Sequence, residues 1–323
     1  MKKSAVVTLF SGVALLFGAC TQTTTTDTSN ASSPASDIGG KKDSVAKAES
    51  PAPALVPEVK PLDAQYTFFR YKDSGKQRMR DYTAEQKDII YTLNRVDASN
   101  LRSADTLIVP TTWPQDRREL SPFPQSVASL REVNKFIIFS YPIQAYAIYT
   151  NGVLEKWGPT SMGSKIHKTP TGLFFTNWKS KESISTSNDE WILKWNFNIS
   201  NHGGVGFHQY ALPGIPASHS CLRLLAKDAE WLYSFADQWK LDASGNTVEV
   251  KGTPVLVYGE YPWGARRPWR NLLDNPKAND VSEAEITSMM EPHLAEIATQ
   301  QQKRAALPVE APKTTDTAKT AMN

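Results

Sequence analysis

The residues best suited to do chemistry lie between positions 204 and 224. A strand-like run, Gly204-Val205-Gly206-Phe207-His208-Gln209-Tyr210, is followed after a Pro- and Gly-containing turn by Ser218-His219-Ser220-Cys221-Leu222-Arg223. A cysteine thiol has an ordinary pKa near 8.5 and needs help to become the nucleophilic thiolate. A cysteine with one or two histidine neighbours can carry out acyl transfer, which makes Cys221 the candidate nucleophile.

Two histidines are candidates for the general base. His219 is two residues from Cys221, and in an extended segment residues two apart point to the same face, so the imidazole and the thiol can meet. His208 is 13 residues upstream of Cys221, at the end of a predicted strand. The turn at residues 213–216 can fold it back beside the thiol. The sequence leaves open which histidine deprotonates Cys221.

Arg223, Ser218 and Ser220 complete the candidate site. Arg223 is on the same face of an extended segment as Cys221, so it can hold a substrate carboxylate or pair with an Asp or Glu side chain. We expect all three residues to lie near the substrate. His167, His202 and His293 belong to no recognisable pattern, and the few Cys and His residues form no convincing metal set. We therefore expect no metal.

The N-terminus predicts export. Lys2 and Lys3 precede a short apolar run and then Gly18-Ala19-Cys20, the order typical of an export signal. We expect residues 1–19 to be a lipoprotein signal peptide and Cys20 to carry lipid; the alternative is a plain signal peptide. Since the chain has only two cysteines, lipidation would leave Cys221 as its one free thiol. An unpaired thiol in an oxidising compartment suggests use, although a buried, inert cysteine is the alternative.

Elements that must position these residues can be predicted from periodicity. Between residues 130 and 260 apolar runs typical of strands predict a mainly β domain. Asn151-Gly152 predicts a tight hairpin turn. One helical face carries Trp231, Leu232, Phe235, Ala236 and Trp239. The predicted strands cover 135–140, 143–150, 153–157, 173–176, 191–197, 205–208 and 254–258.

Other parts of the chain surround this domain. Residues 20–60 are rich in Thr, Ser, Ala and Pro and predict a disordered linker, as does the tail at 306–323. Residues 261–305 form a predicted extension with a helix over 281–305. Its Trp263–Arg270 cluster can either bind sugars and carboxylates or act as a flap over the barrel. The net charge of +3 is too small to indicate nucleic-acid binding.

A small module is predicted at residues 66–112. Thr83-Ala84-Glu85-Gln86 is a capping box, followed by apolar residues at helical spacing. The Leu93-Asn94 pair and the strand ending at Pro110 resemble the second half of a LysM module, an α/β fold that binds N-acetylglucosamine-containing glycans. The alternative is a helical cap packed on the next domain.

The 130–260 segment resembles the L,D-transpeptidase (YkuD-like) catalytic domain family. The resemblance is carried by His208, by Ser218-His219-Ser220-Cys221 followed by an apolar residue and Arg, by Thr160-Ser161-Met162-Gly163, and by Lys168-Thr169-Pro170-Thr171-Gly172-Leu173-Phe174. It covers about 125 residues in the family's order. It implies a β-sandwich or barrel with one or more helices. One departure stands out, since Ser220 occupies the position of a family glycine, and we expect its backbone to adopt an ordinary conformation.

The resemblance implies a reaction as well, one that needs no metal and no organic cofactor. Cys221 is the nucleophile, His208 and His219 match the two family histidines, Ser218 orients the second histidine, and Arg223 binds a carboxylate or is structural. A thioester forms with a peptidoglycan stem peptide and is resolved by an amine. The expected partners are stem peptides, wall glycan and, through the lipid, the membrane on the periplasmic side. The alternatives are a hydrolase of the same fold and a weakly active wall-binding lipoprotein.

Overall fold

The computed structural model describes residues 56–185 and 190–308. The predicted signal peptide, Cys20, and nearly all of the linker and tail lie outside these residues. In the part that is described, no helix has the length and apolar character needed to cross a membrane.

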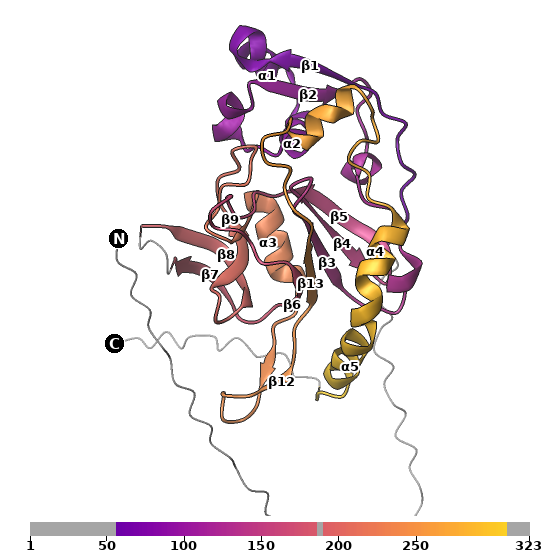
Figure 1. Ribbon diagram of the computed structural model, residues 1–323, viewed down its shortest axis with the longest axis vertical. Coiled ribbons are helices and arrows are strands. Elements are labelled where there is room, and N and C mark those ends of the chain that lie inside the picture. Colours follow the sequence, from indigo (N-terminus) through magenta and orange to yellow (C-terminus); the bar gives the residue numbers. More distant parts are fainter. Residues whose placement is uncertain (1–55, 186–189, 309–323) are drawn as a thin grey trace, which may run out of the picture. The chain divides into compact units, whose positions relative to one another are not determined.

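Residues 130–260, predicted to be mainly β, are built on two main sheets (Figure 1). The five-stranded sheet has the order β5-β4-β3-β13-β6. Its strands are β3 (Phe136–Ser140), β4 (Ala145–Thr150), β5 (Val153–Pro159), β6 (Gly172–Phe175) and β13 (Pro254–Tyr258). Most residues of β3, β4 and β13 are buried, so this sheet forms the centre of the main hydrophobic core.

The four-stranded sheet has the order β10-β9-β8-β7 and carries the candidate site. Its strands are β7 (Lys179–Ile184), β8 (Ile192–Ser200), β9 (Val205–Gln209) and β10 (Leu222–Leu224). β9 and β10 are parallel, with Leu222 opposite Phe207 and Arg223 opposite His208. Leu222 and Phe207 are fully buried. Because side chains alternate along a strand, His208 and Arg223 face away from that core.

Local signals in the sequence account for several of these elements. Thr150 pairs with Val153 across Asn151-Gly152, and both turn residues have positive φ, as the predicted hairpin turn requires. Helix α3 (Ala226–Phe235) follows β10. It ends at Phe235, so the predicted extension of its face to Ala236 and Trp239 is wrong. The chain turns extended at Ala236 and continues into a short two-stranded sheet of β11 (Lys240–Leu241) and β12 (Val248–Val250).

Residues 66–110 form a small unit with a core of its own. Two antiparallel strands, β1 (Tyr66–Arg70) and β2 (Thr106–Pro110), enclose a π-helical turn at Tyr71–Gly75, α1 (Lys76–Asp81), α2 (Ala84–Asn94) and a 3-10 helix at Ala98–Ala104. The predicted capping box at Thr83 and Gln86 is confirmed. Asn94 explains the Leu-Asn pair: its amide donates to Ile90 and Ile108 carbonyls and accepts from the Ile108 N–H, fastening α2 to β2.

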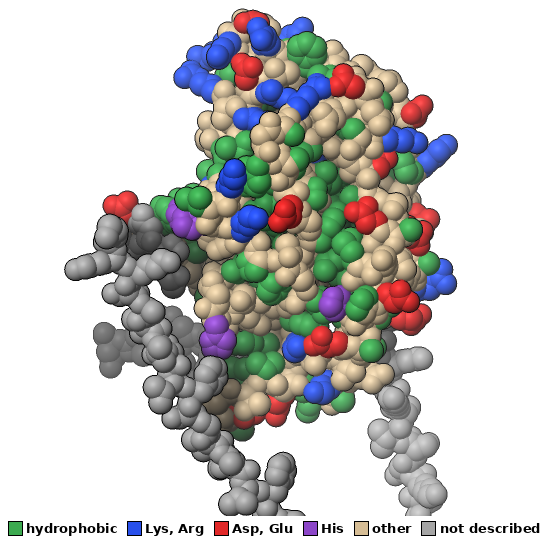
Figure 2. Space-filling view, in the orientation of Figure 1, with side chains coloured by type: hydrophobic (Ala, Val, Ile, Leu, Met, Phe, Trp, Pro, Cys, Tyr) green, Lys and Arg blue, Asp and Glu red, His purple; other side chains and the backbone are tan. Residues whose placement is uncertain are grey.

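Arg95 joins this unit to the two-sheet region. Its fully buried guanidinium lies between the rings of Trp157 and Trp269, and its Nε donates to the Ile143 carbonyl at 2.9 Å. Arg267, from the Trp263–Arg270 cluster, donates to the Ser103 carbonyl at 3.0 Å. The cluster therefore straps the unit in place, and Trp269, being buried, cannot stack on a sugar. Lys and Arg side chains gather over the end of the N-terminal unit that carries β1 and α1 (Figure 2).

Short helices complete the chain. Two 3-10 helices, at Arg117–Leu120 and Ala128–Leu130, precede β3, and a third, at Pro268–Leu273, belongs to the strap. The helix predicted over 281–305 is found in two parts, α4 (Glu283–Met290) and α5 (Leu294–Ala305), separated by a 3-10 turn at Glu291–His293. Pro292 accounts for the break, because proline cannot donate the backbone hydrogen bond that a continuous helix needs.

Candidate active site

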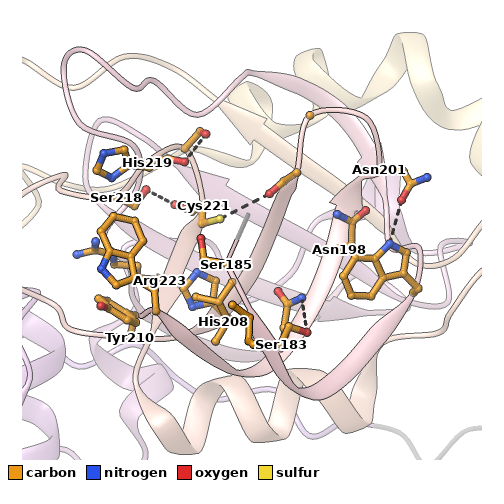
Figure 3. A pocket seen from close by; sticks show the side chains of 18 residues that line it. Ser183, Ser185, Asn198, Asn201, His208, Tyr210, Ser218, His219, Cys221 and Arg223 are labelled. Atoms are coloured by element: carbon orange, nitrogen blue, oxygen red, sulfur yellow. Dashed lines mark hydrogen bonds between the residues drawn. The ribbon is translucent and has the colours of Figure 1, made fainter. Parts of the chain in front are cut away.

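Cys221 lies in a pocket of about 170 Å³ between the β7–β8 hairpin, the end of β9 and the segment leading into β10 (Figure 3). All six residues selected from the sequence line this one pocket. They are Cys221, His219, His208, Arg223, Ser218 and Ser220. Trp178, Ile184, Trp191 and Leu193 supply apolar walls from the hairpin. The rest of the lining is largely polar, so the pocket combines an apolar wall with many groups that can donate or accept hydrogen bonds.

The thiol of Cys221 is a weak acid in this setting. Burial raises its pKa, while the Gly206 backbone N–H and the charge of Arg223 act in the opposite direction. Its Sγ lies 3.8 Å from the Gly204 carbonyl oxygen, to which it donates. At neutral pH the sulfur is therefore protonated, and the site needs a base to make the thiolate.

His208 is suited to be that base. Burial lowers its pKa to about 4, opposed by its hydrogen bond to Gln209 and helped by the charge of Arg223, so the imidazole is neutral at pH 7. Its Nδ1 lies 3.0 Å from the Gln209 carbonyl oxygen. Since a carbonyl only accepts, Nδ1 carries the proton and Nε2 keeps its lone pair. Figure 3 shows His208 on the neighbouring strand, beside Cys221.

Residues 219–221 do not have the extended conformation that would bring the His219 ring to the same face as Cys221. Ser220 between them has a φ of +73°, so the side chains of His219 and Cys221 do not stand side by side as in a strand. The His219 ring is exposed and stacks on His167, with ring centroids 4.2 Å apart, and lies 5.0 Å from Trp191. In Figure 3 it is turned away from the sulfur. The geometry favours His208 over His219.

The expectation of an ordinary backbone at Ser220 is wrong. A non-glycine residue at this φ costs roughly 1 kcal/mol or more relative to glycine, which explains why glycine suits the position. The surroundings hold the strained segment. Thr169 donates to the Ser220 carbonyl at 2.9 Å, and Ser218 donates to the Cys221 carbonyl at 2.5 Å. Ser218 therefore orients the backbone of Cys221 rather than the ring of His219.

Arg223 does not form the ion pair considered from the sequence. Within 56–185 and 190–308 it has no carboxylate partner. Its guanidinium lies 4.6 Å over the ring of Tyr210, and one Nη donates weakly to the Ala211 carbonyl at 3.4 Å. The unpaired positive charge at the pocket wall can bind a carboxylate.

Several pocket residues escaped sequence reasoning. Trp191 and Tyr210 flank the site with ring centroids 6.3 Å apart, and His167, expected to be incidental, reaches it by stacking on His219. No spacing signal marks Trp178 or Asn198, because the β7–β8 hairpin brings them in from outside the motif. For metal binding, no group of three or more His, Cys, Asp or Glu side chains suited to an ion occurs among the residues described.

Known proteins resemble this chain over part of its length. A search of curated proteins gave no match. Among solved structures, an L,D-transpeptidase from Stackebrandtia nassauensis is 21% identical with a TM-score of 0.33, covering 40% of this chain and 57% of its own. One from Mycobacterium smegmatis is 19% identical with a TM-score of 0.31, covering 39% and 59%. One from Mycobacterium tuberculosis H37Rv is 20% identical with a TM-score of 0.31, covering 48% and 73%.

This chain thus spans less than two thirds of the first two of those proteins, and similarities this weak carry no argument about activity. The sequence model of the L,D-transpeptidase catalytic domain family, YkuD, matches residues 134–257. That range contains every residue of the candidate pocket. Residues 134–257 therefore belong to the L,D-transpeptidase (YkuD) catalytic domain family.

Proposed function

We propose that the chain is a peptidoglycan L,D-transpeptidase that forms a thioester between Cys221 and a stem peptide and passes the acyl group to an amine. The observation that carries the proposal is the neutral His208, oriented by the Gln209 carbonyl, in one pocket with the thiol of Cys221. A protonated nucleophile beside a neutral, oriented base is the arrangement that nucleophilic acyl transfer needs. The family match supplies the class of substrate.

The first half-reaction begins when the Cys221 sulfur attacks the carbonyl carbon of the third stem residue. Nε2 of His208 takes the thiol proton as the C–S bond forms. The tetrahedral intermediate then expels the amine of the fourth residue, which takes the proton from His208. Cys221 is left as a thioester.

The second half-reaction reverses these roles. The acceptor amine attacks the thioester and gives a proton to His208 as the new amide forms. The Cys221 thiolate leaves and recovers that proton.

Backbone N–H groups at residues 220 and 221 are the proposed stabilisers of the oxyanion. Donors fixed in advance toward the developing charge are usually the largest single contribution to acyl transfer. Ser220 has an unusual φ, and hydrogen bonds from Thr169 and Ser218 restrain the carbonyls on each side of the nucleophile. These restraints support a fixed orientation of the two N–H groups. Arg223, with its unpaired charge, is proposed to bind a carboxylate of the stem peptide.

Incubation of the protein with tetrapeptide stems and an amine acceptor, followed by mass spectrometry of the products, tests the proposal. Cross-linked product with loss of D-alanine is expected. Release of D-alanine without cross-linking would instead identify a hydrolase. Absence of any acyl-enzyme at Cys221 would contradict the proposal.

The location and the small N-terminal unit are further parts of the proposal. Residues 1–20 support export and a lipid on Cys20, which mass spectrometry of the membrane fraction should find as an acylated N-terminal peptide. The Leu93-Asn94 pair and the strand ending at Pro110 support glycan binding by residues 66–110. Sedimentation of the Cys221→Ala protein with wall glycan stripped of stem peptides tests this; failure to sediment would contradict it.

A further inference from the structure

A second groove begins where the candidate active site ends. It has a volume of about 560 Å³, within the usual range for small-molecule sites. Tyr210 lines both this groove and the pocket of Cys221. One side of the groove comes from the N-terminal unit, with Tyr91 on α2 and residues 97–100. The other side comes from the catalytic domain, with residues 209–211 and 225–227.

Contacts between the two sides make the groove a preformed feature. Asp97 accepts a hydrogen bond from the Leu212 N–H at 2.7 Å, and the Asp97 N–H donates to the Leu212 carbonyl at 3.1 Å. Asp88 on α2 pairs with Lys227 at 2.5 Å and with Arg117 at 3.5 Å. Hydrogen bonds and an ion pair thus tie the N-terminal unit to the catalytic domain at two places.

The groove chemistry favours a neutral ligand rich in hydroxyl groups. Of its two carboxylates, Asp88 is paired with Lys227, and Asp97 accepts hydrogen bonds from the backbone N–H groups of Ser99, Asn100 and Leu212. Tyr91 lines the groove and is partly exposed, and the negative quadrupole of an aromatic ring attracts C–H groups such as those of a pyranose. Asn100 and Gln209 add amide groups, which both donate and accept hydrogen bonds.

The distance from the groove to the sulfur suits a sugar that carries a stem peptide. Leu225, on the groove wall, is four residues after Cys221 along extended chain, or roughly 13 Å. In the proposed reaction the attacked carbonyl belongs to the third stem residue. Three extended residues span roughly 10 Å, so a sugar in the groove would place that carbonyl near the thiol.

We infer that this groove, formed jointly by α2, residues 97–100 and the wall around Tyr210, is a subsite for the glycan sugar from which the donor stem peptide hangs. The inference rests on the proposed function and adds to it, since it makes the N-terminal unit part of the substrate site. The enzyme then prefers stems attached to glycan over free stem peptides.

The test uses the full chain and two substrates, a free tetrapeptide stem and the same stem on its disaccharide. Ala98 lines the groove and is exposed, so Ala98→Trp fills the groove without removing a core side chain. We expect kcat/KM for the disaccharide substrate to fall about tenfold, mostly through KM, and kcat/KM for the free stem to stay within twofold. Ala298→Trp, at an exposed alanine on α5, is the matched control and should change neither.

A binding measurement separates this inference from the proposed function. Calorimetry with Cys221→Ala protein should show the disaccharide-linked stem binding about tenfold more tightly than the free stem, and Ala98→Trp should remove that difference. This result would uphold the groove even if the enzyme proved to be a hydrolase. Equal affinity for both ligands, or an equal loss of both in Ala98→Trp, would overturn the inference.

Discussion

The hydroxyl of Thr169 donates a 2.9 Å hydrogen bond to the carbonyl of Ser220, the strained residue before Cys221. The Thr169 hydroxyl oxygen also accepts a hydrogen bond from the Gly163 N–H at 2.8 Å, and the Tyr141 hydroxyl donates to the Gly163 carbonyl. The loop is tight, since a Cβ at Gly163 would lie 2.2 Å from the His167 carbonyl. A chain of hydrogen bonds thus runs from β3 and its following turn to the nucleophile.

Removing the Thr169 hydroxyl should release this strain at the expense of the active geometry. We expect Thr169→Val to lower the rate of Cys221 acylation by a β-lactam about tenfold, equivalent to about 1.4 kcal/mol in the barrier. Glycine adopts positive φ readily, so the same change in a Ser220→Gly background should cost less than threefold. Thr169→Ser is the control and should keep the rate. Equal losses in both backgrounds would show that Thr169 does not act through Ser220.

Ser220→Gly by itself should affect stability more than rate. Relief of positive-φ strain is expected to stabilise the fold by up to about 1 kcal/mol, measured by denaturant unfolding. Because Thr169 and Ser218 already hold the segment, the acylation rate should change less than tenfold. A much larger gain in rate would mean that serine cripples the natural site and would favour a weakly active wall-binding protein.

Cys221→Ala should abolish product formation and leave the fold intact. The thiol donates one long hydrogen bond to the Gly204 carbonyl and receives one from the Gly206 N–H, and it joins no side-chain network among the residues described. Circular dichroism and the unfolding midpoint should match those of the parent protein. Turnover that survives this substitution would refute the proposed mechanism.

Substitution should distinguish the role of His208 from that of His219. His208→Gln is expected to slow acylation 10²–10⁴-fold, the range for losing a general base. His219→Gln should slow it less than tenfold, because that ring stacks on His167 and is turned away from the sulfur. His167→Gln serves as the control for the stacked pair. A larger loss for His219 than for His208 would reverse the assignment of the base.

The low pKa of His208 should be visible in both rate and stability. Acylation should hold its plateau as pH falls through 6.5 and decline only near pH 4, where His208 gains its proton. The pKa of His208 is 6.5 in the unfolded chain and about 4 in the folded protein. Between these two pH values the unfolded chain binds more protons, so the free energy of unfolding falls by about 3 kcal/mol as the pH is lowered from 6.5 to 4. His208→Gln should flatten this fall in urea unfolding. A rate midpoint near 6.5 would contradict a buried, neutral His208.

The sequence by itself determined the elements whose cause is local. Alternating apolar residues and the Asn151-Gly152 turn predicted the β3–β4–β5 meander, and Thr83 with Gln86 predicted the start of α2. The Ser-His-Ser-Cys motif made Cys221 the candidate nucleophile through its family resemblance, because a cysteine near a histidine is by itself a weak signal. The break at Pro292 within the C-terminal helix is also a local effect, although the sequence reading missed it.

Only the tertiary structure decided which groups meet. The parallel pairing of β9 with β10 sets His208 opposite Arg223, and no sequence spacing specifies that register. The carbonyl of Ser220 accepts a hydrogen bond from Thr169, which is 51 positions away and reaches it only after folding. The groove likewise needs α2 to lie against residues 209–227, contacts that depend on Asp97, Leu212 and Lys227. Local propensity cannot predict such features, because their energies come from partners distant in the chain.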